Sequence, residues 1–345
     1  MKRVSGNLAN NPCRPSVHRS IDRINRFHWN RFSGKGLRSL TVPLASAGLL
    51  LFQLTLPPVL NHNTFGAEKK KIILEHSDSI EGEQSERNSY NTVSGNVLFR
   101  HNNMSLRCDR ATDFGQEKRI VLSGNIVIGS SNFEIYGDSG VYYPDRETGE
   151  LSGNIRGRLI DKPLSAKGQQ AVFNKASNLV WLNGDAIAWY DRQQISGDVV
   201  VLHLKESGKA KESMTIDRIQ VEGNAFFASG SAPGELPAVF DQIGGKKMVI
   251  LLDDESKIKG ITVSGQAEIL YHIYDENHRP SGINYSSGDE IRIFFSEGEL
   301  KRVKVTGSVE GKHYPQRFWQ DRGIDLQKFA WRENENPFRQ QKSLP

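Results

Sequence analysis

Cysteine is nearly absent from this sequence. The 345 residues contain two, Cys13 and Cys108. If a membrane separates the first from the second, no disulfide can join them, and the fold must be held by its core and its backbone hydrogen bonds. Methionine is also scarce, whereas glycine is frequent, with 32 residues. This composition favours strands and turns over long helices.

The body of the chain lacks an excess of positive charge. Residues 1–67 hold nine Lys or Arg and one Asp, whereas residues 68–345 hold 36 basic and 39 acidic residues. The formal net charge of +5 therefore comes from the N-terminal segment. Because a body that binds nucleic acid needs a basic surface, we expect no nucleic-acid partner.

Catalytic and metal-binding motifs are also missing. The sequence contains no HExxH, no GxSxG and no Walker A motif, and Cys108 belongs to no nucleophile signature. We therefore predict that the chain is not an enzyme and uses neither a metal nor a cofactor. Histidines of the body also lack the spacing of metal ligands, as for His101, His203, His272, His278 and His313.

The N-terminal segment combines basic and apolar character. Residues 39–67 carry no charged side chain, and nine basic residues precede them. About 20 apolar residues span a bilayer, and basic flanks stay in the cytoplasm. Residues 1–67 are therefore predicted to be a basic leader followed by either a signal peptide or a membrane anchor formed by residues 40–60. Both alternatives place the body outside the cytoplasm.

Seven short segments share one pattern around a glycine. The residues two before and two after this glycine are apolar in all seven segments. The residue directly after the glycine is Asn, Asp, Gln or Ser. The alternation predicts a strand with one buried face. We expect the glycine on that buried face, where it marks a bulge or makes room for a neighbour or a ligand. The glycines are Gly95, Gly124, Gly153, Gly184, Gly223, Gly265 and Gly307.

A second, looser segment lies between these copies. Examples are Gly137-Asp138, Gly197-Asp198 and Gly288-Asp289, each followed by apolar residues at alternate positions. Each unit is then strand, turn, strand, and such units bury their faces against their neighbours. The predicted fold is all-β: an elongated, twisted stack of repeats, either V-shaped or jellyroll-like.

Three regions are expected along the chain. The leader covers 1–67 and the jellyroll covers 68–312, with a boundary between subdomains suggested near 205–213. Residues 313–345 form a polar tail with aromatic side chains. This tail is either disordered or a segment that docks on a partner.

The repeated pattern resembles a known family. Gly-Asp with alternating apolar residues, then a turn, then apolar-x-Gly-Asn-apolar resembles the OstA/LptA family of lipopolysaccharide transport proteins, which includes LptA, LptC and the N-terminal jellyroll of LptD. The resemblance is strongest from Val93 to Leu204 and continues to Val309. It implies a periplasmic β-jellyroll that binds the acyl chains of lipopolysaccharide and joins other members end to end. With a retained leader, the chain would resemble the anchored LptC type.

A lipid-binding groove follows as an expectation from the repeat and the resemblance. The expected function of the protein is lipopolysaccharide transport or bridging in the periplasm. The partners would be the acyl chains of lipid A, other jellyroll proteins joined by edge-strand addition, and a head-to-tail homo-oligomer. Small residues such as Ala186 and Ala188 would leave space for the lipid. The predicted lining is Val97, Phe99, Ile126, Ile128, Tyr142, Phe173, Ala186, Ala188, Leu202, Phe227, Ile250, Ile269 and Ile293.

Other functions remain as alternatives. The repeated Asp109, Asp138, Asp198 and Asp289 could serve a polysaccharide-active enzyme on a β-solenoid or a calcium ladder. We favour a structural role in which each Asp begins a strand and caps a turn, because a catalytic pair is local whereas these residues recur with the repeat. A structural filament of the envelope is a third alternative.

The ends of the rolled sheet are expected to leave free strand edges. We place these edges near Val93–Phe99 and near Arg302–Val309, and we expect the first to dock an upstream partner. The tail would cover the second edge. Deletion of residues 316–345 would then increase head-to-tail oligomers.

Overall fold

The computed structural model describes residues 72–84, 89–206, 214–231, 238–296 and 299–339. The predicted leader, including its apolar residues 40–60, lies outside these ranges. Within them, no helix is long and apolar enough to cross a membrane.

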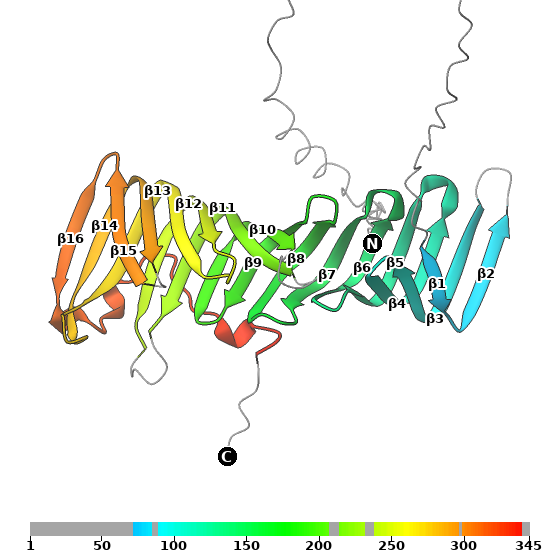
Figure 1. Cartoon of the computed structure of the whole chain (residues 1–345), viewed down its shortest axis with the longest axis horizontal. Helices are drawn as coiled ribbons and strands as arrows, with labels where there is room; N and C mark the ends of the chain where they lie inside the picture. The colour runs from blue at the N-terminus through cyan, green and yellow to red at the C-terminus, as the bar shows by residue number, and fades with distance from the viewer. Residues whose placement is uncertain (1–71, 85–88, 207–213, 232–237, 297–298, 340–345) are drawn as a thin grey trace, which may run out of the picture. The chain divides into compact units, whose positions relative to one another are not determined.

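The described chain forms one antiparallel sheet of 16 strands (Figure 1). From β3 to β15, each strand pairs with the next one in sequence. The all-β, twisted jellyroll expected from the sequence is confirmed. The strands are β1 Ile73–His76, β2 Ser79–Gln84, β3 Ser89–His101, β4 Met104–Phe114, β5 Arg119–Gly129, β6 Phe133–Tyr143, β7 Thr148–Leu159, β8 Leu164–Asn174, β9 Leu179–Tyr190, β10 Gln193–Glu206, β11 Met214–Gly230, β12 Phe240–Leu252, β13 Ile258–Tyr274, β14 Pro280–Ser296, β15 Glu299–Thr306 and β16 Glu310–Pro315.

The sequence repeat corresponds to pairs of strands. Six of the glycine segments lie on the odd-numbered strands β3 to β13, and the seventh begins at the end of β15 with Gly307 in the turn after it. The looser segments lie on the even-numbered strands β4 to β14. Between β10 and β11 the pairing runs up to Glu206 and Met214, so the sheet is continuous across the suggested boundary near 205–213. Short 3-10 turns complete the chain: η1 Gly115–Glu117, η2 Pro144–Arg146, η3 Gln316–Phe318, η4 Arg322–Ile324 and η5 Glu333–Glu335.

Each repeat glycine begins a two-residue bulge. In β5, Gly124 has φ +74° and Asn125 has φ +45°, and the pairing with β4 shifts register there. The Asn125 side chain donates a hydrogen bond of 2.9 Å to Asp109 on β4. A Cβ on Gly124 would lie 2.3 Å from that carboxylate, so only glycine fits.

Two expectations about this motif need correction. The bulge is confirmed, but the glycine is half-exposed beside a solvent-facing carboxylate and does not lie on the buried face. The repeated Asp residues do not cap turns. They lie inside the even-numbered strands, opposite the bulges, because the carboxylate accepts the hydrogen bond of the bulge Asn, as for Asp109, Asp138 and Asp198.

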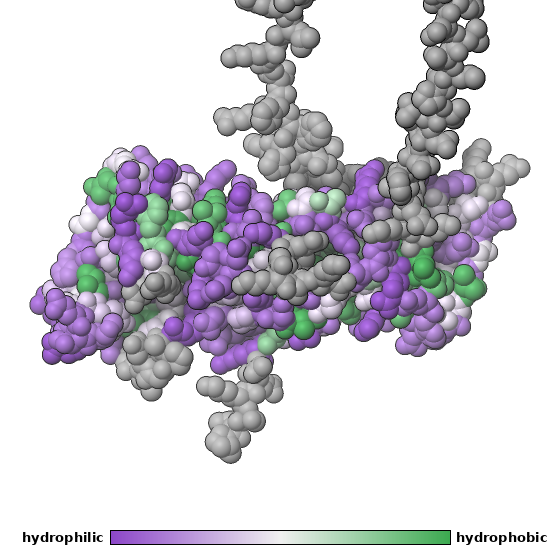
Figure 2. Space-filling view, in the orientation of Figure 1, coloured by the Kyte–Doolittle hydropathy of each residue, from purple (hydrophilic) through white to green (hydrophobic). Residues whose placement is uncertain are grey.

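The bulges divide the strands from β3 to β14 into two arms that fold toward each other. In β5, Ile120 before the bulge and Ile128 after it are both 1% exposed. His101 at the end of β3 lies 2.6 Å from the hydroxyl of Tyr142, which pairs with Ile120 at the opposite end of β5. The two ends of the strands therefore meet across the interior. One continuous apolar core fills the space between the arms, while polar side chains cover most of the face seen in Figure 2.

The ends of the sheet differ from the prediction. β1 and β2 both pair with β3, so Val93–Phe99 is covered and is not a free edge. Between β1 and β2, Asp78 accepts a hydrogen bond from Asn96 of the β3 bulge, as the repeated Asp residues do at the other bulges. At the other end, β15 and β16 pair with the two halves of β14. The edge expected near Arg302–Val309 therefore corresponds to β15 and the turn after it.

The C-terminal residues 316–339, which we call the strap, pack on the outer face of the sheet (drawn in red in Figure 1). Leu326 is 6% exposed and contacts the outward-facing side chains Phe226, Leu270 and Ile283. A disordered tail is therefore wrong for these residues, and the segment docks on its own sheet. The strap crosses the face of the sheet instead of covering the free edge of β15, so the predicted capping role is also wrong.

Candidate functional site

The structure gathers all thirteen predicted groove residues in the interior. None is more than 7% exposed, and all belong to the single core cluster between the arms. They come from ten strands between β3 and β14. The interior is therefore a continuous apolar layer along the sheet, built from inward-facing residues of both arms.

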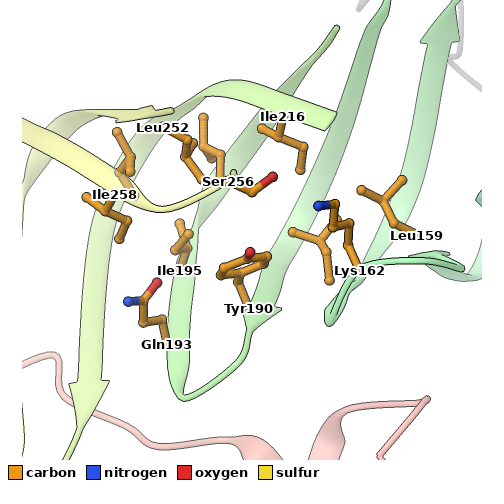
Figure 3. Close-up of a pocket in the computed structure, with 12 residues that line it drawn as sticks. Leu159, Lys162, Tyr190, Gln193, Ile195, Ile216, Leu252, Ser256 and Ile258 are labelled. Carbon is orange, nitrogen blue, oxygen red and sulfur yellow. The ribbon is translucent and has the colours of Figure 1, made fainter. Parts of the chain in front are cut away.

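The middle of this interior is closely packed. The small residues Ala186, Ala188, Ala225 and Ala267 are fully buried. An inner pocket lies where the turn after β7, the β9–β10 hairpin and the β12–β13 turn meet, and its volume is only about 10 Å³. Figure 3 shows its lining, with the Tyr190 ring beneath Ser256.

A larger space opens in the first half of the sheet. This rim cavity has a volume of about 330 Å³. Its walls are apolar, formed by residues such as Met104, Phe173 and Leu204, and its mouth is polar. At the mouth, Lys175 donates a hydrogen bond of 2.7 Å to Asn103.

Polar contacts join the two rows of turns along the line where the arms meet, which we call the seam. Lys175 reaches Asn103, and Asn102 donates a hydrogen bond of 2.6 Å to Glu147. Further along, Tyr190 is hydrogen-bonded to Ser256. Burial raises the pKa of Tyr190 above its ordinary value, so the phenol stays neutral and the contact does not titrate near neutral pH.

Sequence reasoning missed the apolar outer face under the strap. Phe226 and Leu270 stand next to inward-facing Phe227 and Ile269, so two adjacent apolar residues break the alternation. These pairs were the available signal. A strand that buries only one of its faces alternates apolar and polar residues. A strand that buries both faces shows a continuous run of apolar residues.

A second missed signal is the charge at the fourth bulge. Asp185 occupies the position held by Asn in most other copies, and Arg332 of the strap donates two hydrogen bonds to it, of 2.6 and 2.7 Å. Arg332 also binds Glu335, which Lys167 contacts as well. Hydrogen bonds from Arg332 and then Lys167 lower the pKa of Glu335 to about 2. The strap is thus fixed by ionic as well as apolar contacts.

The repeated aspartates form no shared site. Asp138 and Asp198 are each bonded to the Asn of their own bulge. Within the described ranges, no group of three or more His, Cys, Asp or Glu side chains is placed to hold a metal ion. Cys108 is buried, and burial raises the pKa of its thiol to about 12, so it is a poor nucleophile.

Comparison with known proteins supports the resemblance seen in the sequence. Residues 69–183 match the family model described as OstA-like protein. This stretch is OstA-like. No curated protein matches the chain. A solved structure with 13% identity and a TM-score of 0.33 is the crystal structure of LptH, the LptA-homologous periplasmic component of the lipopolysaccharide transport device from Pseudomonas aeruginosa; the match covers 45% of this chain and 97% of that one.

The OstA-like stretch contains most of the lining of the rim cavity, from Asn103 to Val180. The apolar outer face beneath the strap, with Phe226, Leu270 and Ile283, lies beyond it. The two halves of the sheet therefore share the repeat, and the apolar outer cluster that the strap covers belongs to the second half.

Proposed function

We propose that this chain is a lipopolysaccharide-binding transport or bridging protein of the periplasm that holds acyl chains between the two arms of its sheet. The observation that supports this proposal best is the continuous apolar interior from β3 to β14. The OstA-like match over residues 69–183 supports the same conclusion.

The energetics favour binding without catalytic machinery. Each acyl methylene moved from water into an apolar interior contributes about 0.8 kcal/mol. The rim cavity, at about 330 Å³, falls at the lower end of the range of about 300–1,000 Å³ for ligand sites. A full acyl chain therefore requires the arms to part.

Parting the arms costs little at the seam. Apolar side chains such as Leu159 and Ile258 meet there, and the polar contacts that join the turns are single hydrogen bonds, as between Lys175 and Asn103 or Tyr190 and Ser256. Each contributes about 1 kcal/mol net, because water replaces it on opening. Burial of four or five methylenes would contribute about 3–4 kcal/mol, which offsets the loss of these contacts.

Passage of lipid to a neighbour would use the ends of the sheet. β1 and β2 leave Ile73 and Ile80 exposed at 58% and 65%, beside unpaired strand edges. Such an edge accepts a strand of another jellyroll protein or of a second copy. The apolar interiors would then be continuous from one protein to the next.

Photo-crosslinking in cells tests the lipid-binding proposal. A photoreactive residue is placed in the full chain at Phe99 or Ile128, which face the interior, and at Asn96 or Asn125, which lie on the solvent-facing bulges as controls. We expect lipopolysaccharide adducts from the interior positions alone. Adducts only from the bulge positions, or none from any, would refute it.

A further inference from the structure

A second, outward-facing opening lies where the end of the strap crosses the turn after β7. This strap cleft has a volume of about 1240 Å³. Its lining combines sheet residues such as Ser165 and Trp189 with strap residues such as Asn336 and Phe338. Its wall on β9 faces away from the apolar core, because Trp189 alternates with the inward-facing Ala188.

Cations outnumber carboxylates around the cleft. Arg158, Lys162 and Arg339 line it, against Asp191 and Glu333. Arg158 lies 2.8 Å from Glu134, and Arg339 lies 3.7 Å from Glu333.

Lys162 differs from the other two cations. It is half-buried, and no ion pair joins it to any residue in the described part of the chain. An anion in the cleft would give this ammonium group the partner that the protein does not supply.

Trp189 provides an independent sign of a ligand. Its side chain lines the cleft and is 3% exposed, yet the indole Nε1–H has no hydrogen-bond acceptor among the described residues. A buried donor without a partner costs about 1–3 kcal/mol, and most are satisfied in native proteins. A ligand oxygen under the strap would satisfy this one.

The strap cleft and the inner pocket share a wall. Leu159, Lys162 and Leu164 line both. Figure 3 shows the Lys162 nitrogen turned toward the middle of the inner pocket, on the side of Ser256. The ammonium group thus marks the boundary between the apolar interior and a polar, cationic outer site, and this boundary lies on the seam.

We infer that the strap cleft receives the phosphate-bearing headgroup of the acylated lipid, with Lys162 binding a phosphate at the junction between headgroup and acyl chains. This inference rests on the proposed function, since it places the headgroup of the lipid whose chains the core would hold. Asn336 and Ser165, already hydrogen-bonded to each other at 2.8 Å, offer polar groups to the headgroup.

Equilibrium binding to the full chain tests the inference. Lipid A, lipid A without its phosphates, and inorganic phosphate are titrated against the wild type, Lys162→Gln and the control Lys247→Gln, which changes a lysine on β12 outside the cleft. We expect Lys162→Gln to weaken lipid A binding about tenfold, as for loss of one charge-assisted hydrogen bond. Binding of the dephosphorylated lipid should not change, and Lys247→Gln should change neither.

The other outcomes separate the two proposals. If Lys162→Gln weakens both lipids equally or neither, the headgroup assignment fails while the lipid-binding proposal stands. If the wild type binds neither lipid, the proposed function fails. Binding of inorganic phosphate alone that depends on Lys162 would then make the cleft a site for a free anion, which also overturns the headgroup assignment.

Discussion

At the scale of single residues, the bend of each strand depends on two consecutive left-handed residues. Gly124 and Asn125 are one such pair, and the carboxylate of Asp109 lies directly over the glycine. Asparagine adopts a positive φ at lower cost than most residues, and here its side chain donates a hydrogen bond to Asp109 on the neighbouring strand. The glycine cannot be replaced, because both its φ and its surroundings exclude a Cβ.

The variant Gly124→Ala tests this requirement. A Cβ would lie 2.3 Å from Asp109 Oδ2, on a residue with φ +74°. We expect the free energy of unfolding to fall by about 1–3 kcal/mol in urea denaturation. Gly115→Ala is the matched control, since a Cβ at that position would have no atom of the described chain within 4 Å. Equal destabilisation of the two variants would contradict the proposed role of the bulge.

The same residues show what sequence reasoning could predict. Alternation around the glycine correctly identified inward-facing residues such as Val97 and Ile126, because strand alternation is a local property. The side on which the glycine lies was predicted wrongly. The two left-handed residues shift the register by themselves, so counting in steps of two fails inside the bulge.

At the scale of structural elements, the strap joins strands that are far apart in the sheet. Its contacts run from Ile283 on β14, through Gln194 on β10, to Tyr136 on β6, whose ring lies 5.8 Å from that of Phe338. Backbone pairing in a repeat fold joins each strand only to its neighbours, and stability is approximately a sum of neighbour terms. A segment that crosses many strands couples them directly.

The strap was beyond sequence prediction for a physical reason. Arg332 and Asp185 are 147 residues apart, and no periodic pattern relates an irregular segment to the outer face it covers. The sequence showed only two signs of the strap: the aromatic residues within 313–345, and Asp185 at a repeat position where most other copies have Asn. Whether such a segment docks on a partner or on its own chain depends on the tertiary arrangement.

The variant Asp185→Asn isolates the ionic contact of the strap. Asn stands at this position in the bulges at Asn96, Asn125, Asn154 and Asn224, so the sheet should keep its geometry. Since Asp185 is about half exposed, losing its pair with Arg332 should cost about 1 kcal/mol, roughly fivefold in the opening equilibrium.

Hydrogen exchange measures this effect. Amides of residues 326–336 should exchange roughly fivefold faster in the variant, while amides of β3 to β5 serve as the internal control. Faster exchange in β3 to β5 as well would mean that the substitution damages the sheet, and no change in the strap would mean that its apolar contacts alone hold it.

At the scale of the whole molecule, the two ends of the sheet carry opposite charge. The residues of β1, β2 and the bend between them include Glu75, Asp78, Glu81 and Glu83 and no Lys or Arg. β15 carries Lys301, Arg302 and Lys304. Opposite charges on the two edges would steer one copy onto the next in a single orientation, and like charges would disfavour the two other pairings. The basic residues on β15 should therefore favour pairing with an acidic strand edge, and they should also discourage pairing with other edges.

A charge-swap experiment tests head-to-tail association of the full chain. We expect Arg302→Glu with Lys304→Glu to weaken self-association about tenfold in sedimentation, because several partly screened pairs are lost. Mixing this variant with a second one carrying Glu81→Lys and Glu83→Lys should restore association. Added salt should weaken the wild-type assembly for the same reason. Truncation after Pro315 is the contrasting case: it exposes the apolar face around Phe226 and Leu270, so it should cause association that salt does not weaken. If the charge-swapped pair fails to associate, or if salt leaves the wild-type assembly unchanged, the edges do not join copies through their charges.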